Sequence, residues 1–136
     1  MKTLPTAHAP LVIRTDFSDA SRWDEAVAAL TATNEDGFMA DVQIVDDPAF
    51  RDLPADRLRE SLPEGYDMGL FGVVDATALA SAETPVLVVD LGDEPGRTLR
   101  VIATEYWGIE NNVSLGNMDF AEFAESVDPD GVFRGF

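Results

Sequence analysis

The stretch "GLFGVVD" at residues 69–75 constrains the fold most, because it is apolar at almost every position. A strand with one face in water alternates apolar and polar residues, whereas a strand buried on both faces forms a continuous apolar run. We therefore expect a strand over 69–74 in which Val73 and Val74 are both buried. Such a strand requires covering layers on both sides of its sheet.

Further apolar runs predict the strands that share this sheet. They lie at 11–17, 38–45, 86–91 and 98–103, and the run at 38–45 shows the alternation expected of a strand. The last two runs flank the turn "DEPG". This arrangement is typical of a β-hairpin, whose two strands are antiparallel.

Helical periodicity separates several of these runs. Trp23, Val27 and Leu30 follow the i, i+4, i+7 pattern and predict a helix over 19–32, with Asp19 or Ser18 as its N-cap. Shorter helices are expected at 54–62, at 76–81 and at 118–127, the last capped by Asn117.

The alternation of strands and helices predicts an α/β (or α+β) fold made of βαβ units. We expect a mixed, mostly parallel sheet with the hairpin as its antiparallel edge and with flanking helices. The length of 136 residues fits a single globular domain over 1–136. Residues 1–10 are predicted to be a loose N-terminal arm, since prolines interrupt them and no apolar run follows the first residues.

The charge of the chain restricts its partners. There are 9 Lys and Arg residues against 26 Asp and Glu residues, a formal net charge of −17. Such a chain is expected to repel nucleic acid and anionic membranes and to attract basic protein surfaces. High solubility is the alternative explanation of the same charge. The absence of cysteine, of a signal peptide and of a long apolar segment predicts a cytoplasmic protein.

The chain lacks the residues that several classes of enzyme require for catalysis. Without cysteine there is no thiolate zinc site and no cysteine nucleophile, and the only histidine, His8, lies in the expected arm. The stretches "GLFG" and "GDEPG" match no glycine-rich phosphate loop. We therefore predict no catalytic residue and no required cofactor.

Four apolar runs end in aspartate, at Asp16, Asp46, Asp75 and Asp90. If these runs are parallel strands, the four carboxylates gather at one edge of the sheet, where ligands of α/β proteins bind. Crowded carboxylates favour a divalent cation, so the four residues are a candidate Mg²⁺ or Ca²⁺ site. The alternative is that each aspartate caps the next helix or begins a turn.

The stretch "EYWGIENNVSLGNMDF" at 105–120 concentrates aromatic, acidic and amide side chains. Trp107, Glu110, Asn111 and Asn112 are candidates for binding a small polar ligand or a peptide. The alternative, which we favour, is a connection from an edge strand to the helix near residue 117, in which these groups satisfy the backbone. We then expect Trp107 to be partly buried, and Glu110 and Asn111 to be held by backbone hydrogen bonds.

The amino-acid sequence of several segments resembles that of a small actinobacterial family of unknown function. The resemblance rests on "LVIRTDFSD", "VQIVDDPAF", "VLVVDLGDEPGRTLRV", "YWGIENNVSLGNMDFAEFA" and "DPDGVFRGF", and it covers nearly the whole chain. It implies no activity and therefore no catalytic residue.

Two functional classes follow from these observations. The first is a small acidic module that binds a basic protein, as an immunity-type or regulatory factor does. The second is a divalent-cation-dependent enzyme or small-molecule binder that uses the strand-end aspartates. We expect the first, because the charge is extreme and no catalytic constellation is present.

Overall fold

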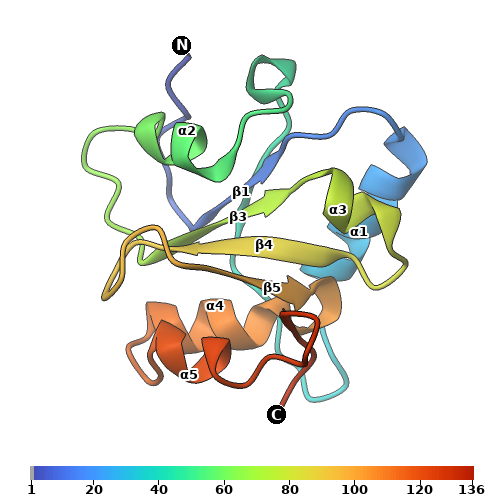
Figure 1. Cartoon of the computed structure of the whole chain (residues 1–136), viewed down its shortest axis with the longest axis vertical. Coiled ribbons are helices and arrows are strands. Elements are labelled where there is room, and N and C mark those ends of the chain that lie inside the picture. The colour runs from blue at the N-terminus through green and yellow to red at the C-terminus, as the bar shows by residue number, and fades with distance from the viewer. Residues whose placement is uncertain (1) are drawn as a thin grey trace.

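A computed structural model describes residues 2–136 and shows one six-stranded sheet with helices on both faces (Figure 1). The strand order is β2-β1-β3-β4-β5-β6. The strands are β1 (Leu11–Arg14), β2 (Gln43–Val45), β3 (Leu70–Val74), β4 (Pro85–Asp90), β5 (Thr98–Ile102) and β6 (Val132–Phe133). The helices are α1 (Ala20–Thr31), η1 (Pro48–Phe50), α2 (Ala55–Glu60), α3 (Ala76–Ala80), η2 (Ala103–Glu105), α4 (Tyr106–Ser114) and α5 (Phe120–Ala124).

The predicted α/β class with a mixed sheet is confirmed. β1 pairs in parallel with β2 and with β3, and β6 pairs in parallel with β5. β4 is antiparallel to β5, as the hairpin prediction requires, and it is also antiparallel to β3. The short strand β6 lies outside this hairpin, so β5 is not the last strand of the sheet. Among residues 2–136, β4 alone runs against the other strands.

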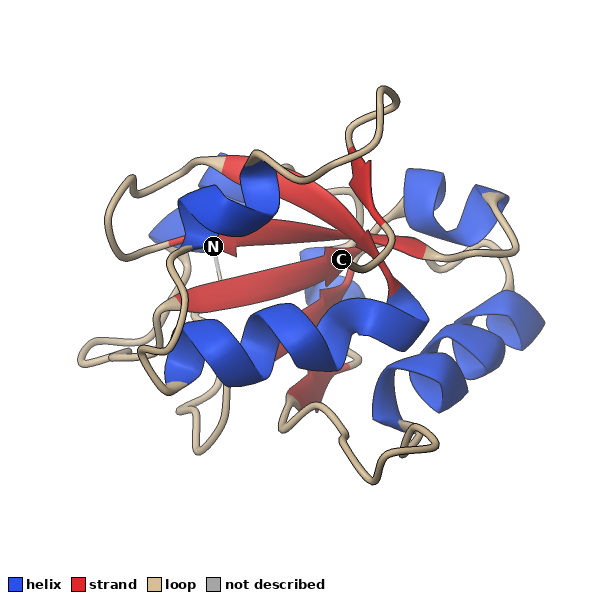
Figure 2. Cartoon of the chain, turned by 90° about the horizontal axis from the view of Figure 1, so that it is seen from below, coloured by secondary structure: helices blue, strands red, loops and turns tan. Residues whose placement is uncertain are grey.

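Strand β3 is buried along its whole length, as its composition predicts. Phe71 and Val73 point into one core, together with Leu58 of α2. Leu70 and Val74 point into the other core, which α1, α3, α4 and α5 cover. The sheet is therefore the middle of three layers, with α2 above it and α4 and α5 below it in the view of Figure 1; Figure 2, seen from below, shows helices in front of the sheet.

The first crossovers cover opposite faces of the sheet. The connection from β1 to β2 runs through α1, on the α4 side, and the connection from β2 to β3 runs through η1 and α2, on the other side. Right-handed crossovers that move in opposite directions along a sheet must lie on opposite faces. The chain thus places β2 and β3 on the two sides of β1, as in a doubly wound sheet.

The helix predicted over 19–32 begins and ends within a residue of its expected bounds. Asp19 is its N-cap, and its carboxylate accepts a hydrogen bond from the amide of Arg22 at 3.0 Å. The helix predicted over 118–127 is shorter, since α5 spans Phe120–Ala124. Its cap is Asp119, not the expected Asn117, because Asp119 and Glu122 form a capping box.

Two other segments differ from their predicted structure. Only Gln43–Val45 of the run at 38–45 is a strand, and Phe38 and Met39 are exposed in the preceding loop. The N-terminal segment is docked on the domain instead of forming a loose arm. Leu4 is buried in the core beside α2, and its amide donates a hydrogen bond to the carbonyl of Ser61 at 2.7 Å.

Candidate functional site

The topology separates the strand-end aspartates. Asp90 ends β4, the reversed strand, and is paired in register with Leu70 at the beginning of β3. Asp75 directly follows the end of β3, and Asp16 and Asp46 follow strands parallel to it. Asp90 therefore lies at the opposite edge of the sheet from the other three aspartates.

Each of these carboxylates has a local role. Asp16 accepts a hydrogen bond from the amide of Ser18 at 2.8 Å, and Asp46 pairs with Arg14 at 3.2 Å. Buried Asp90 accepts from the amides of the turn that follows it, those of residues 92 and 94, at 2.9 and 3.0 Å. Residues 2–136 contain no group of three or more His, Cys, Asp or Glu side chains placed to hold a metal ion. Asp16 and Asp90 thus stabilise turns, the alternative left open by the sequence, whereas Asp46 forms an ion pair.

Asp75 connects α3 to the sheet. Its carboxylate caps α3 through the amide of Ala78 at 3.0 Å and receives Arg100 of β5 through two nitrogens, at 3.0 and 2.8 Å. Burial alone would raise the pKa of Asp75, but the hydrogen bonds from Arg100 and Ala78 outweigh it and hold this pKa below its usual value. The carboxylate is therefore an ionised structural partner of Arg100 at neutral pH.

The segment 105–120 is mainly a helix, not the irregular connection that we expected. Helix α4 spans Tyr106–Ser114 and buries Tyr106 and Ile109 against the sheet, with Val113 packed on the same core. These three residues follow the i, i+3, i+7 pattern of an amphipathic helix, which is the signal that predicts α4. The neighbouring glycine and asparagines, which are poor helix formers, obscured that pattern.

Glu110 fastens α4 to the loop before β2. Its side chain is only 3% exposed, and it accepts hydrogen bonds from the amide of Asp41 at 2.5 Å and from the hydroxyl of Ser114 at 2.9 Å. Asn111 donates to the carbonyl of Met39 at 3.2 Å. The expected backbone hydrogen bonds of Glu110 and Asn111 are thus confirmed, and they act across the fold, since residues 39–41 lie some 70 positions away in the sequence.

Trp107 is partly buried, as expected, but its partner is a loop residue. Its ring stacks on that of Phe38, with ring centroids 4.9 Å apart and ring planes 10° from parallel. Phe38 is 49% exposed and the adjacent Met39 is 48% exposed. The hydrogen bonds of Glu110 and Asn111 therefore hold a loop that presents apolar side chains to solvent next to α4.

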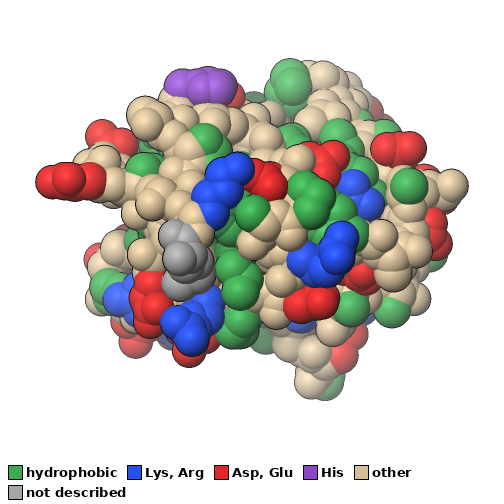
Figure 3. Space-filling model, turned by 90° about the horizontal axis from the view of Figure 1, so that it is seen from above, with side chains coloured by type: hydrophobic (Ala, Val, Ile, Leu, Met, Phe, Trp, Pro, Cys, Tyr) green, Lys and Arg blue, Asp and Glu red, His purple; other side chains and the backbone are tan. Residues whose placement is uncertain are grey.

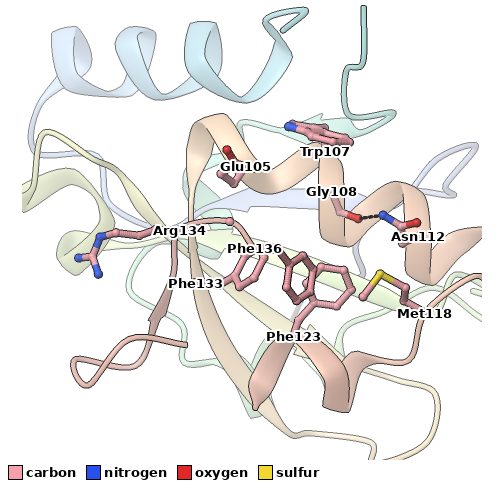
Figure 4. Close-up of a pocket in the computed structure, with 10 residues that line it drawn as sticks. Glu105, Trp107, Gly108, Asn112, Met118, Phe123, Phe133, Arg134 and Phe136 are labelled. Carbon is pink, nitrogen blue, oxygen red and sulfur yellow. Dashed lines mark hydrogen bonds between the residues drawn. The ribbon is translucent and has the colours of Figure 1, made fainter. Parts of the chain in front are cut away.

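A cavity of about 350 Å³ opens beside Trp107, between α4, α5 and the C-terminal residues; we call it the α4 cavity (Figure 4). Of the four predicted binding residues, Trp107 and Asn112 line it, whereas Glu110 and Asn111 do not. Most of its wall was not predicted from the sequence, because its phenylalanines lie on α5, on β6 and at residue 136. The other lining residues are Glu105, Gly108, Met118, Phe123, Phe133, Arg134, Gly135 and Phe136.

The aromatic part of this wall is a cluster of three rings. Phe133 stands edge-on to Phe123, with centroids 5.2 Å apart, and to Phe136, with centroids 5.0 Å apart. Phe123 and Phe133 are buried, whereas Phe136 is 80% exposed. One aromatic side of the cavity is therefore fixed in the core, and the terminal ring lies at its open side.

The polar groups that line the α4 cavity differ in whether they have hydrogen-bond or ion-pair partners. Asn112 donates to the carbonyl of Gly108 at 2.7 Å, and Arg134 is bound by the carboxylates of Glu83, Asp128 and Asp130. Figure 4 shows the Arg134 guanidinium turned away from the phenylalanine rings. The carboxylate of Glu105 forms no hydrogen bond or ion pair with any other residue in 2–136. Glu105 is thus the one lining carboxylate of this part of the chain that is available to a ligand.

Charge is unevenly distributed between the two sides of the molecule. Between residues 103 and 136 the only basic residue is Arg134, against seven acidic residues, and the loop 32–42 adds Glu35, Asp36 and Asp41 with no basic residue. On the opposite face, formed by the N-terminal segment and α2, Lys and Arg side chains are interleaved with Asp and Glu (Figure 3). The α4 cavity is therefore built from a strongly acidic part of the chain.

The fold and this cavity define a small doubly wound α/β domain with an aromatic-lined surface pocket. Residues 9–136 match the model of one family, the domain of unknown function DUF6924, and the chain belongs to that family. The expected resemblance to a family without an assigned activity is thereby confirmed. No curated protein matches the chain. Within residues 2–136, the helices are all too short or too polar to cross a membrane.

Proposed function

We propose that the protein is a binding module for a basic protein partner, of an immunity or regulatory type, and that the α4 cavity is the centre of its contact surface. The observation that carries this proposal is the position of exposed aromatic groups around Trp107, beside segments 32–42 and 103–136, whose one basic residue, Arg134, is held by three carboxylates. Protein interfaces are enriched in aromatic residues and methionine at their centres and are surrounded by polar rims.

The shape of the surface supports the same conclusion. Phe38 and Met39 project from the loop before β2, Trp107 lies beside them, and Phe136 lies on the other side of the cavity. The acidic residues of segments 32–42 and 103–136, here called the acidic rim, accelerate the encounter with basic proteins and disfavour acidic ones, whereas the apolar centre provides the binding energy. The hydrogen bonds of Glu110 and Asn111 keep this surface ordered before binding, which lowers the entropic cost of association.

The cation-dependent alternative has less support. It requires convergence of the strand-end aspartates, but Asp90 lies at the opposite edge of the sheet and Asp75 is paired with Arg100. If the carboxylate of Asp75 bound a cation instead, the partly buried guanidinium of Arg100 would lose its partner. We therefore propose no reaction through these residues.

The experiment that tests the proposal compares three immobilised baits: the wild-type protein, Trp107→Ala and Leu115→Ala. Leu115 is a matched control because it is an exposed apolar residue, 74% accessible, at the other end of α4 and outside the cavity lining. Proteins captured from cells that contain the natural chain are identified, purified and measured individually by calorimetry at low and high salt.

We expect a basic protein that binds the wild-type protein and Leu115→Ala equally and binds Trp107→Ala at least about tenfold more weakly, as at an interface hot spot. Its affinity is expected to fall as salt rises, since the acidic rim contributes electrostatically. A purified partner that binds Trp107→Ala as tightly as the wild-type protein, or that is acidic, would refute the proposal.

A further inference from the structure

We infer that the α4 cavity receives one basic side chain, an arginine or a lysine, and that Glu105 is its counter-ion. This inference rests on the proposed function and specifies the chemistry of its central contact. It is carried by the combination of an aromatic wall with a single available carboxylate.

The volume of the cavity fits one side chain. At about 350 Å³ it is at the lower end of the size range of ligand pockets. Its wall consists largely of aromatic rings and Met118, which can enclose the aliphatic stem of a long side chain. A small site of this kind suits one extended group of a partner rather than a large ligand.

The charges of the lining select a cation. The carboxyl group of Glu105 has no partner in residues 2–136, whereas Arg134, the lining cation, is already bound by three carboxylates. An anionic group would be repelled by Glu105 and by the acidic rim. An uncharged apolar group would remove Glu105 from water without replacing its hydrogen bonds, which is unfavourable. A guanidinium or ammonium group satisfies the carboxylate and can also lie against aromatic rings in cation–π contacts.

Gly135 lies directly beside the carboxylate of Glu105. Its φ of +110° is a backbone conformation that favours glycine, and a β-carbon at this position would be in ordinary van der Waals contact, at 3.4 Å, with the carboxyl carbon of Glu105. The bend of the chain at Gly135 thus brings the C-terminal residues next to Glu105 of η2. The ring of Phe136 follows directly in the sequence, so the carboxylate and an exposed aromatic ring are placed next to the same opening.

The inference is tested by NMR titration of the ¹⁵N-labelled full chain with acetyl-Gly-X-Gly-amide peptides. In these peptides X is arginine, lysine, or citrulline, which has the shape of arginine without its charge. The reporters are the indole N–H of Trp107 and the backbone amides of Gly108 and Gly135, which line the cavity. We expect the arginine or lysine peptide, or both, to shift these signals, and the citrulline peptide to bind at least about tenfold more weakly, as expected for the loss of a charge-assisted contact.

Variants then assign the contact to Glu105. Glu105→Gln should weaken binding of the cationic peptide about tenfold, whereas Glu105→Asp should retain most of it. Glu125→Gln is the matched control: it changes the net charge equally and lies on α5's C-cap outside the cavity lining, so it should leave binding nearly unchanged. Melting curves establish that each variant is folded.

Equal binding of the arginine and citrulline peptides would overturn the inference, as would equal losses in Glu105→Gln and Glu125→Gln, or the absence of any shift. None of these outcomes would by itself refute the proposed function. That proposal is judged separately by whether a basic protein loses affinity for Trp107→Ala.

Discussion

The hydroxyl of Tyr106 is buried and has no hydrogen-bond partner within residues 2–136. Burial raises the pKa of Tyr106 far above its usual value, and the nearby Tyr66 and Glu110 raise it further. The hydroxyl lies against Gly72 of β3, where a β-carbon would be only 2.5 Å from the hydroxyl oxygen. Glycine at this position of the sheet therefore accommodates the side chain of Tyr106.

An unpaired buried hydroxyl should destabilise the fold, so Tyr106→Phe is expected to be stabilising. We predict a gain of about 1 kcal/mol in the free energy of unfolding, since phenylalanine fills the same space without a polar atom that lacks a partner. The measurement is urea unfolding followed by circular dichroism.

Tyr66 is the matched control for this prediction. Its hydroxyl donates to the carbonyl of Leu70 at 2.8 Å and accepts from the amide of Leu11 at 3.1 Å. Tyr66→Phe should therefore lower the free energy of unfolding by about 1–3 kcal/mol, because two buried backbone groups lose their partner. Destabilisation of Tyr106→Phe by a similar amount would show that its hydroxyl is hydrogen-bonded in solution.

At the scale of elements, α4 and the loop before β2 depend on one another. Glu110 is a buried carboxylate that holds this loop through the amide of Asp41, whereas the contact of Asn111 with Met39 is more exposed. Since residues 38–39 present the ring that stacks on Trp107, this attachment also shapes the proposed contact surface.

Removing the hydrogen bonds that hold this loop should lower the free energy of unfolding, and more so for the buried Glu110 than for the more exposed Asn111. We predict that Glu110→Ala lowers the free energy of unfolding by about 1–3 kcal/mol, and that Asn111→Ala lowers it by about 1 kcal/mol or less. Both variants should also broaden or shift the NMR signals of Phe38, because the loop loses its anchor. An Asn111→Ala variant with an unchanged melting temperature and unchanged Phe38 signals would show that its hydrogen bond has no structural role.

The ion pair of Asp75 with Arg100 predicts a specific pH dependence. The folded-state pKa of Asp75 is depressed, so its contribution to stability is present above the unfolded-state pKa, near 4, and is lost as the pH falls through the folded-state value. Asp75→Asn preserves an N-cap for α3 but removes the charge. We expect this variant to be about 1–3 kcal/mol less stable at neutral pH and to lose less stability than the wild-type protein on acidification. Parallel acid dependence of the two proteins, measured by urea unfolding across the acidic range, would contradict this role.

For the whole molecule, the dominant feature is the net charge of −17. Self-repulsion of this size destabilises the compact state, and salt reduces it by screening. We predict that NaCl raises the melting temperature and that MgCl₂ or CaCl₂ at matched ionic strength raises it no further, since the strand-end aspartates do not converge. A specific cation site would instead add about 2.7 kcal/mol when the cation is present at 100 times its dissociation constant. Such an additional increase in the melting temperature would restore the cation hypothesis.

Local patterns in the sequence determined much of the framework. The apolar run of β3 predicted a strand buried on both faces, and the spacing of Trp23, Val27 and Leu30 with Asp19 predicted α1 and its cap. The DEPG turn predicted the antiparallel hairpin of β4 and β5. These features follow from interactions between residues close in the chain or from the burial of one segment. They can therefore be predicted without knowing which distant segments pack against them.

Only the tertiary structure decided where the candidate sites lie. The reversed direction of β4 moves Asp90 away from Asp75, although both follow similar apolar runs. The α4 cavity joins residues from α4, α5 and the C-terminal segment, and its neighbouring loop is held by a hydrogen bond between Asp41 and Glu110. Strand direction and contacts between distant segments depend on how the whole chain packs, and side chains that converge in this way leave no periodic pattern in the sequence.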